Sequence, residues 1–183
     1  MPFRFSKLPL DGLVLIEPQV FTDDRGFVME SFKASDFASN ELPSGFVQEN
    51  HSVSSKNVLR GLHYQTLPYA QGKLIRCVRG KVADIAVDIR RNSPTFGQWV
   101  KEVLSAENRK MLYIPSGFAH GFVVLSETAE VIYKIHGSEY APQYERGIRW
   151  DDPVLAIEWG VKDVIVSDKD MKQPLFKDAE VFE

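Results

Sequence analysis

Two side chains suited to acid–base or anion-binding chemistry lie inside the apolar stretch NVLRGLHYQ, residues 57–65. Arg60 is a permanent cation and His63 carries a titratable imidazole, yet both occur among residues typical of a buried strand. Charge inside apolar walls is unfavourable unless it is paired or binds a ligand. We therefore interpret Arg60 and His63 as residues that point into a cavity, whereas their apolar neighbours build its wall.

A second histidine, His120, follows a Pro-Gly turn in PSGFAHGF and resembles the histidine of PxGxxH, the second metal-binding motif of cupins. A divalent ion needs three or four imidazole and carboxylate ligands, which in cupins normally include an HxH pair and a Glu from the first motif. The corresponding place here reads HYQ, residues 63–65, and no Glu follows at the usual spacing. Because His63 thus lacks a second ligand, we expect no metal site.

The cavity would then hold two imidazoles, His63 and His120, beside the cations of Arg60 and Lys73. The chain has 22 basic and 25 acidic residues and a net charge of -3, so its overall field does not favour nucleic acid or an anionic membrane. A local group of cations in such a protein calls for an anionic ligand, and a phosphate-bearing small molecule fits. The sequence has no GxxxxGK[ST] and no GxGxxG, so side chains such as Arg would bind the phosphate.

Short runs rich in Val, Ile, Phe and Tyr, separated by Gly, Pro, Asn and Asp, must position these residues. Such runs are typical of a β-sandwich or barrel. In KVADIAVDIR, residues 81–90, the side chains alternate with a period of two, which indicates a strand rather than a helix. Together with the two Gly-flanked polar sites, the runs predict an all-β, double-stranded β-helix, which is a jelly-roll, cupin-like barrel.

Helices are expected only at the periphery of this barrel, as one or two short segments. Residues 33–42, KASDFASNEL, predict one of them, with Ser35 as its N-cap. The tail after Trp159 is less strand-like and is expected to wrap around the barrel.

Two carboxylates, Asp84 and Asp88, face the same way on one predicted strand and could form an acid–base pair. More often such carboxylates hold neighbouring arginines. We therefore interpret them as partners of Arg76 or Arg90, with catalysis as the less favoured alternative.

The length of 183 residues, with 44% hydrophobic residues, predicts a single domain over residues 1–183. Cys77 is the only cysteine, so it cannot form an internal disulfide, and its apolar surroundings indicate a buried packing role in a reducing compartment. The first residues lack the unbroken apolar core of a signal peptide, and no segment approaches the ~20 apolar residues that span a bilayer. We therefore expect a cytoplasmic protein without a membrane partner.

Motifs from about Ile16 to Pro174 closely resemble the dTDP-4-dehydrorhamnose 3,5-epimerase family: LRGLHYQ, QGKLIRC, DIRRNSPTFGQW, LYIPSGFAHGF, VIYK and SDKD. The resemblance implies a cofactor-free isomerase of dTDP-L-rhamnose synthesis. Such an enzyme converts dTDP-4-dehydro-6-deoxyglucose to dTDP-4-dehydro-L-rhamnose by removing and returning protons at carbons 3 and 5, beside the 4-keto group. The resemblance also implies a homodimer in which the N-terminal part of one chain helps to complete its neighbour's site.

Four catalytic roles follow from this resemblance, motif by motif. The histidine of LRGLHYQ, His63, matches the family's general base, and Asp170 of SDKD matches its carboxylate partner. Tyr133 of VIYK matches the residue that returns a proton from the opposite face, and Lys73 of QGKL matches the group that stabilises the enolate. These types suit the chemistry, because inversion needs a base and an acid on opposite faces of the carbon.

The resemblance also implies a set of substrate-binding residues. Tyr140 would stack on the thymine ring, although Tyr144 competes for this role. Arg60 and His120 match groups near the sugar and diphosphate. The remaining matches to nucleotide-sugar contacts are Arg25, Glu30, Gln48, Glu49, Asn50, Glu145 and Lys169.

Other functions remain open at this point. An epimerase of a related dTDP-4-keto-6-deoxysugar could invert only carbon 3 or only carbon 5, since the outcome depends on the pose of the sugar. A metal-dependent cupin oxygenase or isomerase would contain stoichiometric metal, and a non-catalytic nucleotide-sugar binder could use the same barrel. The fold alone does not choose among these functions.

Overall fold

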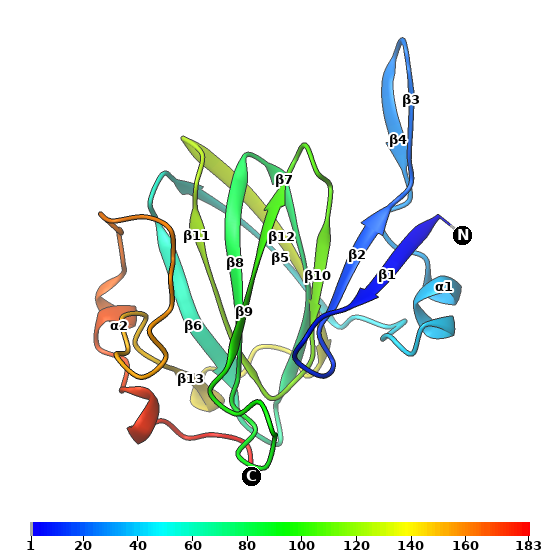
Figure 1. The fold of residues 1–183 in the computed structure, drawn as a ribbon. Helices are drawn as coiled ribbons and strands as arrows, with labels where there is room; N and C mark the ends of the chain where they lie inside the picture. The colour runs from blue at the N-terminus through cyan, green and yellow to red at the C-terminus, as the bar shows by residue number, and fades with distance from the viewer. Residues whose placement is uncertain (1) are drawn as a thin grey trace.

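Strands form most of the computed structural model, which describes residues 2–183, and two antiparallel sheets face each other (Figure 1). The first sheet has the order β1-β2-β10-β7-β12-β5, with strands Phe3–Lys7, Val14–Pro18, Met111–Ile114, Gln71–Arg79, Thr128–Gly137 and Gln48–Ser55. The second has the order β13-β6-β11-β8-β9, with strands Glu145–Gly147, Leu59–Gln65, Phe118–Val124, Lys81–Asp88 and Trp99–Ser105. The predicted all-β, cupin-like fold is confirmed.

A separate hairpin, β3 (Val20–Asp23) and β4 (Gly26–Met29), pairs with no other strand of the described residues and projects away from the two sheets (Figure 1). The helices are short and peripheral, as predicted. They are α1 (Ala34–Ser39), α2 (Asp168–Met171) and the 3-10 turns η1 (Pro142–Tyr144) and η2 (Phe176–Asp178).

The N-cap prediction for α1 is wrong. The helix begins at Ala34, and Lys33 is the N-cap residue with an extended backbone and no side-chain hydrogen bond to the helix. Ser35 lies in the first turn instead, and its carbonyl accepts a hydrogen bond from Ser39 Oγ at 2.8 Å. Packing overrides the cap signal here, because the buried Phe37 anchors the helix in an aromatic cluster.

Strand β6 places Arg60 and His63 on the same face because it contains one extra residue. Opposite it on β11, His120 pairs with His63 and Phe122 pairs with Arg60, so two steps on β11 match three on β6. Residues three apart in a regular strand point to opposite sides of the sheet. A β-bulge adds one residue to the strand, so that residues 60 and 63 point to the same side. The bulge needs Gly61, whose φ is +135° and whose added Cβ would lie 2.5 Å from the backbone of Gly121.

Apolar side chains fill the space between the two sheets, with Ile75, Leu112 and Phe118 among the buried ones. Cys77 belongs to this core and is 1% exposed. A second apolar cluster lies on the other face of the second sheet, where Leu59 and Leu62 meet side chains from the C-terminal tail.

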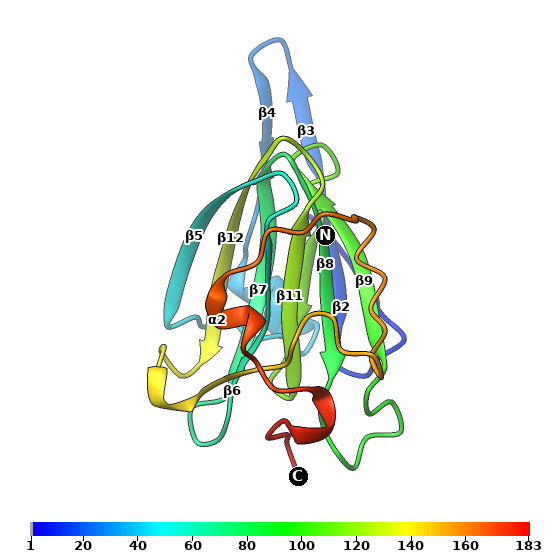
Figure 2. The ribbon, with the colours of Figure 1, turned by 90° about the vertical axis from the view of Figure 1, so that its left-hand side faces the viewer.

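The C-terminal tail crosses the outside of the second sheet, as Figure 2 shows for the segment that carries α2. Ile165 is held beside β6 by two backbone hydrogen bonds, from Leu59 N to Ile165 O and from Ile165 N to Asn57 O, each at 2.9 Å. This contact brings α2 next to the bulge in β6. Within residues 2–183, no helix is long and apolar enough to cross a membrane.

Candidate active site

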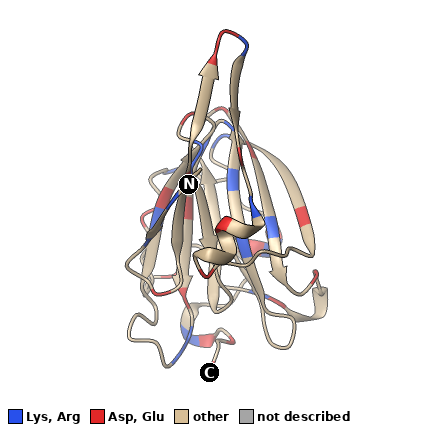
Figure 3. Ribbon diagram, turned by 90° about the vertical axis from the view of Figure 1, so that its right-hand side faces the viewer, with Lys and Arg blue, Asp and Glu red and all other residues tan. Residues whose placement is uncertain are grey.

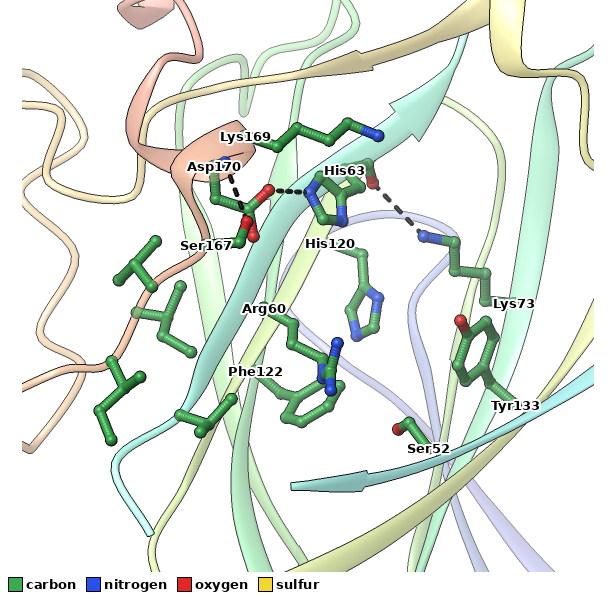
Figure 4. A pocket seen from close by; sticks show the side chains of 14 residues that line it. Ser52, Arg60, His63, Lys73, His120, Phe122, Tyr133, Ser167, Lys169 and Asp170 are labelled. Carbon is green, nitrogen blue, oxygen red and sulfur yellow. Dashed lines mark hydrogen bonds and ion pairs between the residues drawn. The ribbon is translucent and has the colours of Figure 1, made fainter. Parts of the chain in front are cut away.

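A cavity of about 550 Å³ opens between the two sheets, and the tail closes one side of it (Figure 4). Strands β5, β7 and β12 contribute from the first sheet, and β6 and β11 contribute from the second. Its polar lining consists of Ser52, Arg60, His63, Lys73, His120, Tyr133, Ser167, Lys169 and Asp170. The four predicted catalytic residues therefore lie in one cavity.

His63 and Asp170 form a hydrogen-bonded pair at the rim of this cavity. His63 Nε2 lies 2.5 Å from Asp170 Oδ1, and the other carboxylate oxygen accepts a long 3.4 Å bond from the Gly61 backbone N–H. Asp170 is fixed at the start of α2, where its own N–H donates to the N-cap oxygen Ser167 Oγ at 3.1 Å. Burial alone would raise the pKa of Asp170, but the hydrogen bond and charge of His63 and the bond from Gly61 hold it below its usual value.

Lys73 and Tyr133 face this pair from the first sheet (Figure 4). In the β12–β7 pairing Tyr133 lies opposite Ile75 and Ile135 lies opposite Lys73, so both polar side chains are on the inward face. Burial lowers the pKa of Lys73 to about 8, although the charges of Asp84 and Glu145 act in the opposite direction. The Lys73 ammonium makes one long hydrogen bond, 3.4 Å, to the backbone oxygen of His63.

His120 forms a second histidine–carboxylate pair deeper in the sheet. Its Nε2 lies 3.0 and 3.1 Å from the two oxygens of Asp84, which is fully buried. Burial lowers the pKa of His120, and the nearby charges of Lys73 and His63 add to this effect, whereas Asp84 opposes it.

The interpretation of Asp84 as an arginine partner is therefore wrong, and the interpretation of Asp88 is right. Asp88 accepts three hydrogen bonds from Arg90, at 2.8 to 3.0 Å, and one each from Ser93 and Thr95. The difference follows from position. Asp88 ends β8, where the next residues turn back over it, whereas Asp84 lies in mid-strand opposite Phe122 and beside His120 of β11.

A smaller compartment of about 90 Å³ adjoins the main cavity and shares His63, Lys73 and Tyr133 with it. The predicted binding residues Gln48, Asn50, Tyr140 and Glu145 line this compartment. Tyr140 Oη and Lys169 Nζ both donate to Glu145 Oε2, at 2.6 and 2.5 Å.

The tyrosines that competed for the stacking role differ in their surroundings. Half of the Tyr140 residue is exposed beside the small compartment, so its ring remains accessible. Tyr144 instead packs against Tyr69, with ring centroids 4.5 Å apart. This arrangement favours Tyr140.

Three predicted binding residues lie away from the cavity. Arg25 is exposed at the turn of the β3–β4 hairpin, where it pairs with Asp23, and Glu30 follows the hairpin; Figure 3 shows acidic and basic segments meeting at the hairpin tip. Glu49 pairs with Lys134 at 2.5 Å on the outer face of the first sheet. Strand periodicity explains its position, because Gln48 and Asn50 point inward and Glu49 must point outward.

Gln65, which stands where a metal-binding cupin has its second histidine, is used as a structural residue. Its amide nitrogen donates to Tyr69 O at 2.7 Å and to Glu139 O at 3.3 Å, and its amide oxygen accepts from Ala141 N at 2.7 Å. Among residues 2–183, no three His, Cys, Asp or Glu side chains are grouped closely enough to hold a metal ion.

Ser54 and Ser167 were not predicted as site residues, and Asp84 was predicted mainly as the partner of an arginine. Ser54 Oγ accepts a 2.9 Å hydrogen bond from Arg60 Nε and orients that guanidinium. Ser167 could have been recognised, since Ser followed three residues later by an acidic residue is a helix-start signal. The hydrogen bond between Ser54 and Arg60 joins β5 of the first sheet to β6 of the second, and the sequence does not show that these two strands meet there.

Comparison with known proteins agrees with this geometry. Residues 7–178 match the family model described as dTDP-4-dehydrorhamnose 3,5-epimerase. The chain is 54% identical over 180 residues to the dTDP-4-dehydrorhamnose 3,5-epimerase of Shigella flexneri, covering 96% of this chain and 97% of that one.

Two solved structures extend this likeness to the fold. The dTDP-4-dehydrorhamnose 3,5-epimerase of Sulfolobus tokodaii is 49% identical, with a TM-score of 0.94 and full coverage of both chains. A dTDP-6-deoxy-D-glucose-3,5-epimerase from Legionella pneumophila, solved in complex with dTDP-4-keto-L-rhamnose, is 46% identical, with a TM-score of 0.92 and coverage of 96% and 94%. The chain therefore belongs to the dTDP-4-dehydrorhamnose 3,5-epimerase family of epimerases.

Proposed function

We propose that the chain converts dTDP-4-dehydro-6-deoxyglucose to dTDP-4-dehydro-L-rhamnose by inverting carbons 3 and 5. One observation carries the proposal. The His63–Asp170 pair on one side of the cavity faces Tyr133 and Lys73 on the other side (Figure 4). Inversion requires this arrangement, because the proton leaves from one face of the carbon and returns to the other.

His63 acts as the base. The proton on carbon 3 or carbon 5 is acidic because it lies next to the 4-keto group, and the imidazole takes it as the carbon–hydrogen electron pair moves into the enolate. The Asp170 carboxylate, bound to Nε2, fixes the ring and stabilises the imidazolium that forms. Nδ1 is then the nitrogen that meets the substrate.

Lys73 stabilises the enolate. Its side chain lines the cavity and, within residues 2–183, its ammonium makes one long hydrogen bond, so it remains available for the ketone oxygen on which negative charge develops. One such donor in a water-poor site is worth about 3 kcal/mol in the transition state.

Tyr133 completes the inversion. Its phenol O–H donates a proton to the opposite face of the carbon, which leaves a tyrosinate. Exchange with solvent then returns a proton to the tyrosinate and removes one from the imidazolium, so the enzyme is ready for the second carbon. Each inversion therefore introduces one solvent hydrogen at the inverted carbon.

The diphosphate and the thymine of the substrate are bound around these catalytic residues. Arg60, held by Ser54, and Lys169 supply cations at the edge of the cavity, and Tyr140 offers its exposed ring to the thymine. Charge neutralisation explains why these cations can lie together in an otherwise acidic protein.

A second copy of the chain completes the site in this proposal. The β3–β4 hairpin exposes Phe21, Phe27 and Val28, by 55%, 52% and 67%, and no other strand among residues 2–183 pairs with it. An exposed apolar hairpin that carries Arg25 suits docking on a neighbouring protomer. We place the dimer in the cytoplasm, because the buried, unpaired Cys77 suits a reducing compartment.

Solvent labelling tests this function. The protein is incubated with dTDP-4-dehydro-6-deoxyglucose in deuterated water, and the product is examined by proton NMR. Deuterium at both carbons 3 and 5 supports the double inversion, whereas label at only one carbon would identify a single-carbon epimerase. Binding without labelling would identify a non-catalytic binder, and loss of labelling after chelator treatment would identify a metal-dependent enzyme.

A further inference from the structure

Asp84 is a buried carboxylate without a full counter-charge in contact with it. Its residue exposure is 0%, and within the described residues its hydrogen bonds go to one nitrogen, Nε2 of His120. Asp88 on the same strand is equally buried but is paired with the Arg90 guanidinium. A buried carboxylate that lacks such a cation is costly, so the nearest positive charge must offset it.

Lys73 is an incompletely paired cation, as Asp84 is an incompletely paired carboxylate. Lys73 is half-buried, and within the described residues its ammonium makes one hydrogen bond, to the backbone oxygen of His63 at 3.4 Å. Burial disfavours the ammonium, and the carboxylates whose charge opposes this effect are Asp84 and Glu145. The contacts connect the two charges. Lys73 Nζ reaches the backbone oxygen of His63, His63 lies opposite His120 in the β6–β11 pairing, and His120 Nε2 lies 3.0 Å from Asp84.

The other carboxylates near Lys73 are already engaged. Glu145 accepts hydrogen bonds from Lys169 and Tyr140, and Asp170 is bound to His63. The remaining polar side chains of the first cavity include no carboxylate; they are Ser52, Arg60, Tyr133, Ser167, Lys169 and the two imidazoles. Among the described residues, Asp84 is thus the carboxylate that acts on the pKa of Lys73 and is not itself bound to a Lys or Arg.

We propose that Asp84 is a positioning residue that holds the His120 ring by Nε2 and supplies the negative charge that keeps Lys73 an ammonium ion for the enolate. This inference rests on the proposed role of Lys73. Because Asp84 binds Nε2, Nδ1 is the ring nitrogen of His120 left for a ligand. Asp84 itself does not line the cavity and acts only through these two residues.

The test is Asp84→Asn, which keeps the shape and leaves an amide oxygen to accept from His120 but removes the charge. Loss of a nearby opposite charge lowers the pKa of an ammonium by about one unit or more. Because Lys73 must be protonated to stabilise the enolate, the alkaline limb of kcat against pH is expected to move down by about one pH unit. Activity at pH 6.5 should change much less than activity at pH 8.5.

Asp88→Asn is the matched control. It removes an equally buried carboxylate from the same strand and breaks the cluster with Arg90, Ser93 and Thr95, so it should lower the melting temperature without moving the alkaline limb. A purely structural role of Asp84 would give the same pattern as this control. An alkaline limb that stays in place in folded Asp84→Asn protein overturns the inference.

A direct titration separates this inference from the proposed reaction. The Lys73 ammonium is followed by nitrogen NMR in substrate-free protein, where the wild type is expected to titrate near pH 8. Asp84→Asn should titrate at lower pH, and an unchanged titration contradicts the inference even if the enzyme is an epimerase. If Asp84→Asn does not fold, His120→Gln keeps the charge of Asp84 and should leave the titration of Lys73 near its wild-type pH; a large downward shift contradicts the direct role of Asp84.

Discussion

The two histidine–carboxylate pairs have the same chemical groups but different surroundings. His63 and His120 lie opposite each other on β6 and β11, and each binds a carboxylate through Nε2. The side chain of His63 is 28% exposed, and that of His120 is 8% exposed. Asp170 reaches His63 from the tail, whereas Asp84 reaches His120 from the neighbouring strand β8.

This difference separates the chemistry that the two pairs suit. At the rim, His63 is partly exposed, and its Nε2 is bound to a carboxylate whose pKa is held below its usual value, so a negative charge stands beside the ring. His120 lies among buried groups, beside the ammonium of Lys73, and burial holds the pKa of His120 low. The first pair suits proton transfer, and the second suits fixed hydrogen bonding and charge placement.

The largest expected effect comes from replacing the base. His63→Asn should lower kcat by about three orders of magnitude, because it removes the imidazole that takes the proton, while dTDP binding is largely kept. The matched variant His120→Asn should instead act mainly on KM. Steady-state kinetics and calorimetric titration with dTDP measure both effects. Equal losses of kcat in the two variants would remove the distinction between the pairs.

Removal of the carboxylate partner should have the next largest effect. Asp170→Asn keeps a hydrogen-bonding group beside His63 but cannot stabilise the imidazolium, so kcat is expected to fall by about two orders of magnitude. Circular dichroism should show an unchanged fold. A kcat within a few-fold of wild type would mean that His63 acts without Asp170.

The charge of Lys73 should make kcat depend on pH. Its pKa is lowered to about 8, so the ammonium predominates at neutral pH and is lost as the pH rises through that value. We expect kcat to fall on the alkaline side with a midpoint near pH 8. Lys73→Met should lower kcat by about 10²-fold and remove this limb. An alkaline limb that survives in Lys73→Met must come from another group.

The smallest expected effect concerns the support of Asp170. Ser167→Ala removes the N-cap of α2, an interaction worth about 1 kcal/mol, and should loosen Asp170 without changing its charge. We expect kcat to fall a few-fold and KM to stay the same. If kcat falls as far as in Asp170→Asn, then Ser167 has a role beyond capping.

The strands could be predicted from the sequence, and the pairing of His63 with Asp170 could be predicted from the family resemblance, but other contacts of the site could not. Period-two alternation identifies β8, and it could also have placed Glu49 outside the barrel, because Gln48 and Asn50 point inward. The shared face of Arg60 and His63 depends on a bulge that Gly61 only suggests, since glycine in a strand has several explanations. The partner of Asp84 depends on which strand lies beside β8, and a single strand carries no such information.

Proton abstraction can be isolated from the rest of the reaction, and this provides the most direct test of the division between the two pairs. Each variant is incubated with dTDP-4-dehydro-6-deoxyglucose in deuterated water, and the appearance of deuterium at carbon 3 is followed by NMR. Enzyme-dependent exchange should be abolished in His63→Asn and should persist at a reduced rate in His120→Asn. Exchange that persists in His63→Asn and disappears in His120→Asn would contradict the assignment of His63 as the base.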